Sequence, residues 1–327
     1  MTTPERFERF LAEVAPDLGA TVTSVTPITG GYSRFTSVAD IRTADGSEQK
    51  LVLRADPPIG HGVFDSDRDD EWKLLLALWD VDAVDIARPR FYDATGERLG
   101  SKTIVMDHVE GTPLQLSLGS AGDVGAARST FLHVAAALQQ IPVSILPQSM
   151  DKQQDWDAYI DSAIDIYDRA ERELGDSSPV VRYVAGWLRG NRPPPVPLGV
   201  VHGDFQPGNI LIGDGRPPVV IDWEFARVGD PREDIGYYSG SPLPNSLYSA
   251  DPQAFLDEYR ALTGYTDEQV NEEVMAYFFI LGMAELFVQM MHGAASLARG
   301  HRAGIMAPFL VNSLCYFQER YFGICTR

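Results

Sequence analysis

Residues 196–234 form an apolar, strand-like island between segments that are predicted to be helical. Apolar runs occupy 200–201, 210–212 and 219–221, and a turn rich in glycine and proline separates the first two runs. Short apolar runs bounded by turn residues are typical of buried strands. The polar residues Asp204, Asn209 and Asp222 follow or interrupt these runs. We therefore expect a short hairpin with three polar side chains at its strand ends.

These three side chains have the chemistry of a site. Polar groups that converge in an apolar neighbourhood are typical of binding or catalytic pockets. Aspartate and asparagine oxygens suit Mg²⁺, which takes oxygen ligands and is often bound by few protein groups together with phosphate. A further carboxylate that the metal does not consume can accept a hydroxyl proton. The island is therefore the candidate active site.

The first hundred or so residues carry the pattern of an antiparallel sheet. β-Branched runs predict strands, and turn residues such as Asp45-Gly46 separate them. Apolar spacing predicts one helix before the strands and another among them. The predicted strands cover 21–28, 35–41, 51–54, 90–93 and 103–108, and the predicted helices cover 4–15 and 71–79. After the first helix, the order is β-β-β-α-β-β.

Beyond residues 111–113 the pattern becomes mainly helical. Predicted helices cover 121–140, 154–174, 179–190, 251–263, 267–298 and 305–322. A small mixed unit followed by a larger helical one indicates two domains. We expect an N-terminal lobe at 1–109 and a C-terminal lobe at 110–327.

The charge of the chain excludes two classes of partner. With 46 acidic and 27 basic side chains, the net charge is −19. Nucleic-acid binding needs clustered cations, and docking on an anionic membrane needs them too. Both predicted lobes are acidic, so the excess charge belongs to the whole surface and does not identify a substrate.

We expect a cytoplasmic protein. Two cysteines, Cys315 and Cys325, are too few for a disulfide framework and are expected to be reduced thiols. The first ten residues carry acids and lack the apolar core of a signal peptide. Polar residues interrupt the apolar stretch at 274–298, so we interpret it as a core helix and not as a membrane span. The sequence carries no prediction of oligomeric state.

An ordered set of motifs resembles the aminoglycoside phosphotransferase and choline kinase superfamily. The spacing H-x-D-x-x-x-x-N followed by an aspartate at a strand end is shared with protein kinases, although Gly203 replaces their arginine. The resemblance extends over nearly the whole chain. Its carriers are His202-Gly203-Asp204 to Asn209, Ile221-Asp222-Trp223-Glu224, Gly229-Asp230-Pro231 to Asp234, Gly30-Gly31-Tyr32-Ser33, Arg54, Glu71 and the stretch 105–111.

This resemblance implies an α+β, two-lobed protein-kinase-like fold with a small antiparallel-sheet N-lobe and a larger, mainly helical C-lobe. It implies transfer of the γ-phosphoryl group of ATP, or of GTP, to a hydroxyl of a small molecule. Asp204 would be the catalytic base, and Asn209 and Asp222 would hold Mg²⁺. The nucleotide would contact Gly30, Gly31, Ser33, Arg54, Glu71, Asp107 and Val109.

Arg54 departs from the pattern of most kinases, which have a lysine at this strand end. Arginine is always charged and can hold phosphate or carboxylate with two nitrogens, so it can serve the same purpose. An arginine here is similar to the kinase-like domains of acyl-CoA dehydrogenase-associated proteins. Arg54 and Glu71 could instead form a surface ion pair.

Other residues near the motif receive supporting roles. His202 is expected to be a structural hydrogen-bonding residue, because Asp204 already fills the acid–base role. Asp234 is expected to fix the loop. Glu224 could face either the metal or the acceptor.

A row of aspartates on the helix predicted near Trp156 is the one local feature that suggests a cationic acceptor. Its members are Asp157, Asp161, Asp165 and Asp168. Like charges at helical spacing destabilise a helix slightly, so the row could attract an amino-bearing substrate. The alternative is a solvated acidic face.

The acceptor itself stays open. Family members act on aminoglycosides, other sugars, choline-like alcohols or hydroxyacyl compounds. Two other classes are a nucleotide-binding protein with little or no turnover, suggested by Arg54, and a protein kinase. The latter is disfavoured because the segment after Asp222 is too short for an activation loop.

Overall fold

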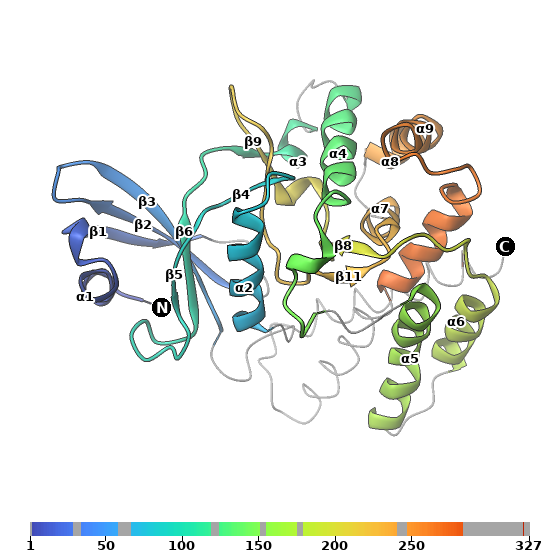
Figure 1. The fold of residues 1–327 in the computed structure, drawn as a ribbon, viewed down its shortest axis with the longest axis horizontal. Coiled ribbons are helices and arrows are strands. Elements are labelled where there is room, and N and C mark those ends of the chain that lie inside the picture. The colour runs from blue at the N-terminus through green and yellow to red at the C-terminus, as the bar shows by residue number, and fades with distance from the viewer. Residues whose placement is uncertain are drawn as a thin grey trace.

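The computed structural model describes residues 2–28, 34–57, 67–118, 124–150, 155–174, 179–240 and 247–283, together with residue 323. Gly30, Gly31, Ser33 and both cysteines lie outside the described residues. Within the described part, the chain forms a sheet-containing unit at one end and a helical unit at the other (Figure 1).

The N-terminal unit is built on a five-stranded antiparallel sheet with the order β1-β2-β3-β6-β5. The strands are β1 (Thr21–Pro27), β2 (Phe35–Arg42), β3 (Glu48–Ala55), β5 (Pro89–Asp93) and β6 (Thr103–Asp107). Helix α1 (Pro4–Val14) buries Phe7, Phe10 and Leu11 against this sheet, and the turn η1 (Pro16–Leu18) follows it. The predicted sequence of five strands with a helix after the third is confirmed, and the short strand β4 (Asp85–Ile86) is an addition that joins another sheet.

Helix α2 (Arg68–Trp79) lies between the sheet and the helical unit (Figure 1). It begins three residues before the predicted start because Asp67 caps it, accepting the backbone N–H groups of Asp69 and Asp70. The earlier start places Arg68 on the same helical turn as Glu71, which matters for the site.

The C-terminal unit is mainly helical, as predicted. Its helices are α3 (Leu114–Ser117), α4 (Val124–Leu138), η2 (Val143–Ile145), α5 (Trp156–Leu174), α6 (Pro179–Gly190), α7 (Arg232–Ser239), α8 (Leu247–Ala250), α9 (Pro252–Thr263) and the described helical residues 272–283. The sequence pattern missed α3, α7 and α8, which are eight residues or shorter. A segment that short offers too few turns for an apolar period to emerge.

The island contains two antiparallel pairs, not the single predicted hairpin. Strands β9 (Ile210–Ile212) and β10 (Val219–Val220) form the hairpin, and β8 (Gly199–Val201) pairs with β11 (Arg227–Gly229). The loop 202–209, which ends in the turn η3 (Pro207–Asn209), therefore leads from one pair to the other. Short strands β4 (Asp85–Ile86) and β7 (Thr112–Pro113) extend the β9–β10 hairpin on either side.

One apolar core runs from the N-terminal unit into the C-terminal unit. It includes Leu74 and Leu78 of α2 and Ile104 and Met106 of β6, together with the buried residues of α4 and α5. Strand β4 also precedes residue 109 but pairs with β10. The two units therefore share an apolar core and a sheet. The domain boundary at residue 109 stays a prediction. In the described part of the chain, no helix is both long and apolar enough to cross a membrane.

Candidate active site

His202 is a structural residue of the loop that carries Asp204. Its ring is fully buried, its Nδ1 accepts the backbone N–H of Asp204 at 3.3 Å, and its Nε2 lies 3.0 Å from the carbonyl oxygen of Ile221. Nδ1 is thus an acceptor, so the proton is on Nε2, which donates to Ile221. Burial lowers the pKa of His202 to about 4, so the ring is neutral.

Asp234 fixes the same loop, as expected. Its carboxylate accepts the backbone N–H groups of His202 at 2.8 Å and Gly203 at 2.9 Å. Burial raises the pKa of this carboxyl to about 7. Its position at the start of α7 brings the helix against the loop.

The structure explains why glycine occupies position 203. Gly203 has a φ of +84°, and a Cβ atom there would lie 2.4 Å from the carbonyl oxygen of Phe225. A side chain would therefore meet both an unfavourable backbone conformation and a steric overlap. The arginine that kinases have at this point does not fit this loop.

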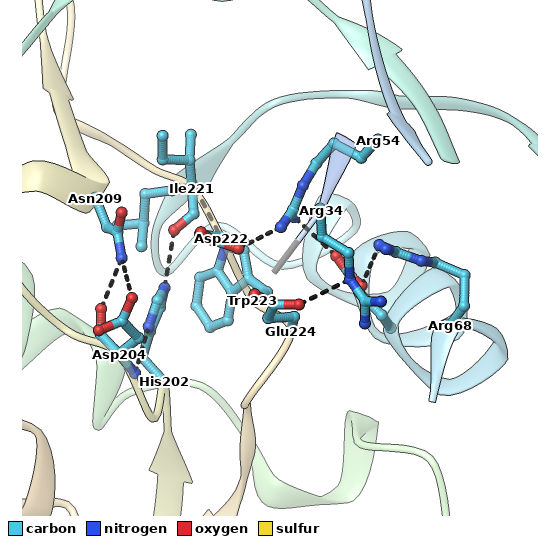
Figure 2. A network of polar contacts seen from close by, with 12 residues as sticks. Arg34, Arg54, Arg68, His202, Asp204, Asn209, Ile221, Asp222, Trp223 and Glu224 are labelled. Carbon is cyan, nitrogen blue, oxygen red and sulfur yellow. Dashed lines mark hydrogen bonds and ion pairs between the residues drawn. The ribbon is translucent and has the colours of Figure 1, made fainter. Parts of the chain in front are cut away.

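Asp204 and Asn209 lie side by side in the loop (Figure 2). The amide nitrogen of Asn209 donates to the backbone oxygen of Asp204 at 2.8 Å and to its carboxylate at 2.9 Å. Gln206 donates to the same carboxylate at 3.0 Å. Burial and the charge of Asp222 raise the pKa of Asp204 to about 6 despite these donors. A carboxylate with a pKa near neutrality suits proton acceptance.

Asp222 follows β10 and has the single positive φ, 71°, among the described non-glycine residues. Strained backbone of this kind is typical of functional positions. The backbone N–H of Ile221 donates to the carbonyl oxygen of Asn209 at 3.0 Å, so the hairpin brings Asn209 and Asp222 together. The amide nitrogen of Asn209 donates to Asp204, so its amide oxygen is not part of that contact.

This donor set fits a magnesium ion. It consists of one amide oxygen and one carboxylate, and Mg²⁺ commonly takes one or two protein ligands together with phosphate oxygens and water. Among the described residues, no group of three histidine, cysteine, aspartate or glutamate side chains could hold a metal by itself. The arrangement suits a metal that arrives with a phosphate-bearing ligand.

A chain of ion pairs begins and ends on the segment that carries Asp222 (Figure 2). Arg54 contacts Asp222 and donates to Glu71 at 2.8 Å. Arg68 joins the second oxygen of Glu71, at 2.6 Å, to Asp56, at 3.0 Å. Arg34 then joins Asp56, at 3.0 Å, to Glu224, at 2.9 Å. In order, the members of this ion-pair chain are Asp222, Arg54, Glu71, Arg68, Asp56, Arg34 and Glu224.

Most of the ion-pair chain is buried, and it links both lobes. The Arg54 and Glu71 side chains are 10% and 1% exposed, so this is a buried pair and not the surface ion pair considered above. Burial alone would lower the pKa of Arg54, but Asp222, Glu71 and Glu224 together raise it well above its usual value. The carboxylate of Glu224 forms an ion pair with Arg34.

Sequence reasoning missed Arg34, Asp56 and Arg68. The i,i+3 spacing of Arg68 and Glu71 on one helix was a usable signal. No sequence pattern indicated the contacts of Arg34 with residues 22 and 190 positions away.

Asp107 and Val109 lie in the connection between the lobes. The backbone N–H of Asp107 donates to Arg88, and its carboxylate accepts Nε of Arg90 at 2.7 Å. The N–H of His108 donates to Lys50. Among the hydrogen bonds of the described residues, none uses the N–H of Val109.

The aspartate row of α5 is paired with arginines. Arg192 contacts Asp157 and Asp161, and Arg189 donates to Asp165 at 3.0 Å and to Asp168. The four carboxylates are between 41% and 78% exposed. This geometry favours the alternative of a solvated acidic face.

A hollow of about 430 Å³ lies beside Glu224. Phe225 and Val228 line it from the segment after Asp222, Ala163 and Ile166 line it from α5, and Leu281 lines it from the helical residues 272–283. No residue of the aspartate row lines this hollow. Its wall combines these apolar side chains with charged ones, namely Asp67, Asp70, Arg169, Glu224, Arg227 and Glu233.

The fold is the two-lobed, kinase-like fold of phosphotransferases. The sequence profile of the phosphotransferase enzyme family matches residues 24–276, which is 253 of the 327 residues. The chain therefore belongs to the phosphotransferase enzyme family. Both the family resemblance and the kinase-like fold predicted from the sequence are confirmed.

Solved structures with the same fold cover nearly the whole chain. A protein from Ralstonia eutropha JMP134, provisionally assigned as an aminoglycoside phosphotransferase, is 18% identical over 100% of this chain and 99% of its own, with a TM-score of 0.71. The aminoglycoside phosphotransferase APH(4)-Ia in complex with ADP and hygromycin B is 18% identical over 98% and 97%, with a TM-score of 0.66. The macrolide 2'-phosphotransferase MphH from Brachybacterium faecium is 19% identical over 95% and 98%, with a TM-score of 0.60. At these identities the likeness establishes the fold alone.

Sequence relatives of this chain are longer proteins. Acyl-CoA dehydrogenase family member 11 from Mus musculus is 26% identical over 238 residues, which is 71% of this chain and 30% of the relative. The Gallus gallus protein of the same name is 27% identical over 58% of this chain and 25% of the relative. This chain spans less than a third of the length of these relatives.

Proposed function

We propose that the protein transfers the γ-phosphoryl group of ATP, or of GTP, to a hydroxyl group of a small molecule with the help of Mg²⁺. The observation that carries this proposal is the contact of Asp204 with Asn209, at the point where the β9–β10 hairpin brings in Asp222. This geometry gives one carboxylate for the acceptor and two oxygen ligands for a metal.

In this proposal Asp204 aligns the acceptor hydroxyl and accepts its proton. The oxygen of the acceptor forms a bond to the γ-phosphorus, and the bond between that phosphorus and the β,γ-bridging oxygen breaks. The nucleoside diphosphate leaves with the bridging oxygen. The main contributions of the protein are positioning and charge neutralisation, as in other phosphoryl transfers.

Asn209 and Asp222 hold the metal through their oxygens. A bound Mg²⁺ neutralises charge on the phosphates. Asn209 also fixes the Asp204 carboxylate through its amide nitrogen, at 2.9 Å, so one side chain couples the metal ligands to the base.

The nucleotide lies between the lobes. The N–H of Val109 and the carbonyl of Asp107 face the adenine or guanine base, and Arg54, supported by Glu71, binds phosphate oxygens. Gly30, Gly31 and Ser33 are proposed to approach the phosphates from the turn before Arg34. These roles rest on the family resemblance and on the contacts of Arg54 described above.

The acceptor enters beside Glu224 and uses the hollow there. The lining combines apolar side chains such as Phe225, Ile166 and Leu281 with six charged ones, so it suits an acceptor that carries both apolar and polar groups. The aspartate row of α5 is a weaker candidate for acceptor contact, because arginines pair with it.

An assay of nucleoside diphosphate release tests the proposal. The panel contains amino sugars, macrolides, choline and hydroxy acids, with Mg-ATP and Mg-GTP. We expect release that depends on one acceptor class, and a loss of about 10²- to 10⁴-fold in kcat for Asp204→Asn with unchanged nucleotide affinity. Asp214→Asn, on the exposed turn of the β9–β10 hairpin, is the matched control.

Retained turnover in Asp204→Asn contradicts the assignment of Asp204. Thermal stabilisation by Mg-nucleotide without turnover on any acceptor favours a nucleotide-binding role instead.

A further inference from the structure

Arg54 connects the two lobes through a single guanidinium group. It lies on β3, and its Nη1 donates to Glu71 of α2 at 2.8 Å while its Nη2 contacts Asp222. A lysine presents one compact ammonium group, whereas the planar fork of arginine can hold two carboxylates at the same time. Arginine stands here in place of the lysine of most kinases. It therefore makes a second contact, to Asp222, which is a proposed metal ligand.

Glu71 does not depend on Arg54 alone. Its second oxygen accepts Nη1 of Arg68 at 2.6 Å, and both of these side chains are 1% exposed. Arg54 can therefore turn away from Asp222 while Glu71 remains paired. Glu71 and Arg68 form a fixed support for such a movement.

Asp222 has fewer partners. Its side chain is 32% exposed, and in the described part of the chain Arg54 is the cation that forms an ion pair with it. A metal ion at Asp222 must share this carboxylate with Arg54 or displace Arg54 from it. The phosphates of a bound nucleotide offer Arg54 a bidentate anionic partner of the kind that arginine prefers.

We propose that Arg54 covers the metal ligand Asp222 in the nucleotide-free protein and leaves it when nucleotide phosphates bind the guanidinium. This inference rests on the proposed function, in which Asp222 binds the metal. Nucleotide and metal then bind with positive coupling, because each favours the arrangement in which Arg54 has left Asp222. The free protein has low affinity for the metal alone.

Binding of Mn²⁺ to the nucleotide-free protein tests this inference, with the electron paramagnetic resonance signal of free Mn²⁺ as the readout. We expect Arg54→Met to bind Mn²⁺ about tenfold more tightly than the wild type, within the usual range of coupling between sites. Arg42→Met is the matched control, because Arg42 forms an exposed ion pair with Glu48 and does not belong to the ion-pair chain. Its affinity for Mn²⁺ should equal that of the wild type.

The double variant with Arg54→Met and Asp222→Asn should lose the gain. Equal Mn²⁺ affinity in Arg54→Met and the wild type overturns the inference, as does a gain that persists in the double variant or is equally large in Arg42→Met. Any of these outcomes leaves the proposed function intact if Asp222→Asn still weakens Mn²⁺ binding in the presence of AMP-PNP. Unchanged Mn²⁺ binding by Asp222→Asn with AMP-PNP contradicts the metal site itself, and both proposals fail.

Arg54→Lys provides a second variant in case Arg54→Met does not fold, which thermal unfolding without ligand checks. Lysine keeps a positive charge against Glu71 but cannot hold both carboxylates through a planar fork. We expect nucleotide-free Mn²⁺ affinity above that of the wild type, and an unchanged affinity overturns the inference.

Discussion

The side-chain amide of Asn209 donates two hydrogen bonds to Asp204, one to its backbone oxygen at 2.8 Å and one to its carboxylate at 2.9 Å. This relationship fixes the orientation of both side chains. Because the amide nitrogen donates to Asp204, the amide oxygen of Asn209 points away from that carboxylate. Thus the position of the proposed base and the direction of a proposed metal ligand have one common cause.

The proton affinity of Asp204 should control the acid side of the pH–rate profile. Its pKa is raised to about 6, chiefly by burial, and it acts as a carboxylate. We expect kcat/KM to fall as the pH drops below about 6. Gln206→Met removes a donor that stabilises the charged form, so the fall should begin at higher pH. Steady-state rates between pH 5 and 8 provide the measurement.

Gln253→Met, on the exposed side of α9, is the control for this profile. An acid limb that does not move in Gln206→Met would show that Asp204 is not the titrating group.

Gly203 should tolerate alanine far less well than Gly215. Both glycines have a positive φ. A Cβ atom at Gly203 would lie 2.4 Å from the backbone oxygen of Phe225, whereas a Cβ atom at Gly215 would have no atom within 4 Å. Gly215→Ala should cost about 1 kcal/mol of unfolding free energy from backbone conformation alone. Gly203→Ala should cost about 3 kcal/mol or more and reduce turnover, because the overlap displaces the loop of Asp204. Urea unfolding and kcat measure the two effects, and equal costs would refute the explanation.

Glu71 should be important for stability as well as for the site. Glu71→Gln removes the charge that Arg54 and Arg68 share in a buried position. Breaking a buried pair typically costs about 3–5 kcal/mol, so we expect a loss of roughly 3 kcal/mol in urea unfolding. Glu48→Gln, in the exposed pair with Arg42, should change the unfolding free energy by at most about 0.5 kcal/mol. Similar values for both variants would contradict the structural role of the ion-pair chain.

The role of the aspartate row of α5 can be tested by changing its two central members. Asp161 and Asp165 contact Arg192 and Arg189, and neither lines the hollow beside Glu224. We therefore expect the double change Asp161→Asn and Asp165→Asn to leave KM for the acceptor unchanged and to cost at most about 1 kcal/mol of stability. Steady-state kinetics with the acceptor identified in the panel measures this KM. A raised KM would support the hypothesis that the row attracts a cationic acceptor.

Local sequence was sufficient to predict much of the fold. The strands of the N-terminal sheet and the long helices of the C-terminal unit have clear apolar periods, and the loop from His202 to Asn209 has a characteristic spacing. The pairing of β8 with β11 was not predictable in this way, because strands of three residues carry no register signal. The short helices α3, α7 and α8 were not predicted for a related reason, because they have too few turns to show an apolar period.

By itself, the sequence determined the phosphotransferase family and the two kinds of lobe, and it singled out Asp204, Asn209 and Asp222 as the proposed site. These are set by local spacing, since loop length and residue type fix what a short segment can present. Only the tertiary structure decided what surrounds them. Arg34, Arg54 and Arg68 meet their carboxylates across separations of up to 190 residues, and the aspartates of α5 meet arginines from the end of α6 and just beyond it. Such pairing depends on how distant segments pack, and among these contacts only the i,i+3 pair of Arg68 and Glu71 had a local signal.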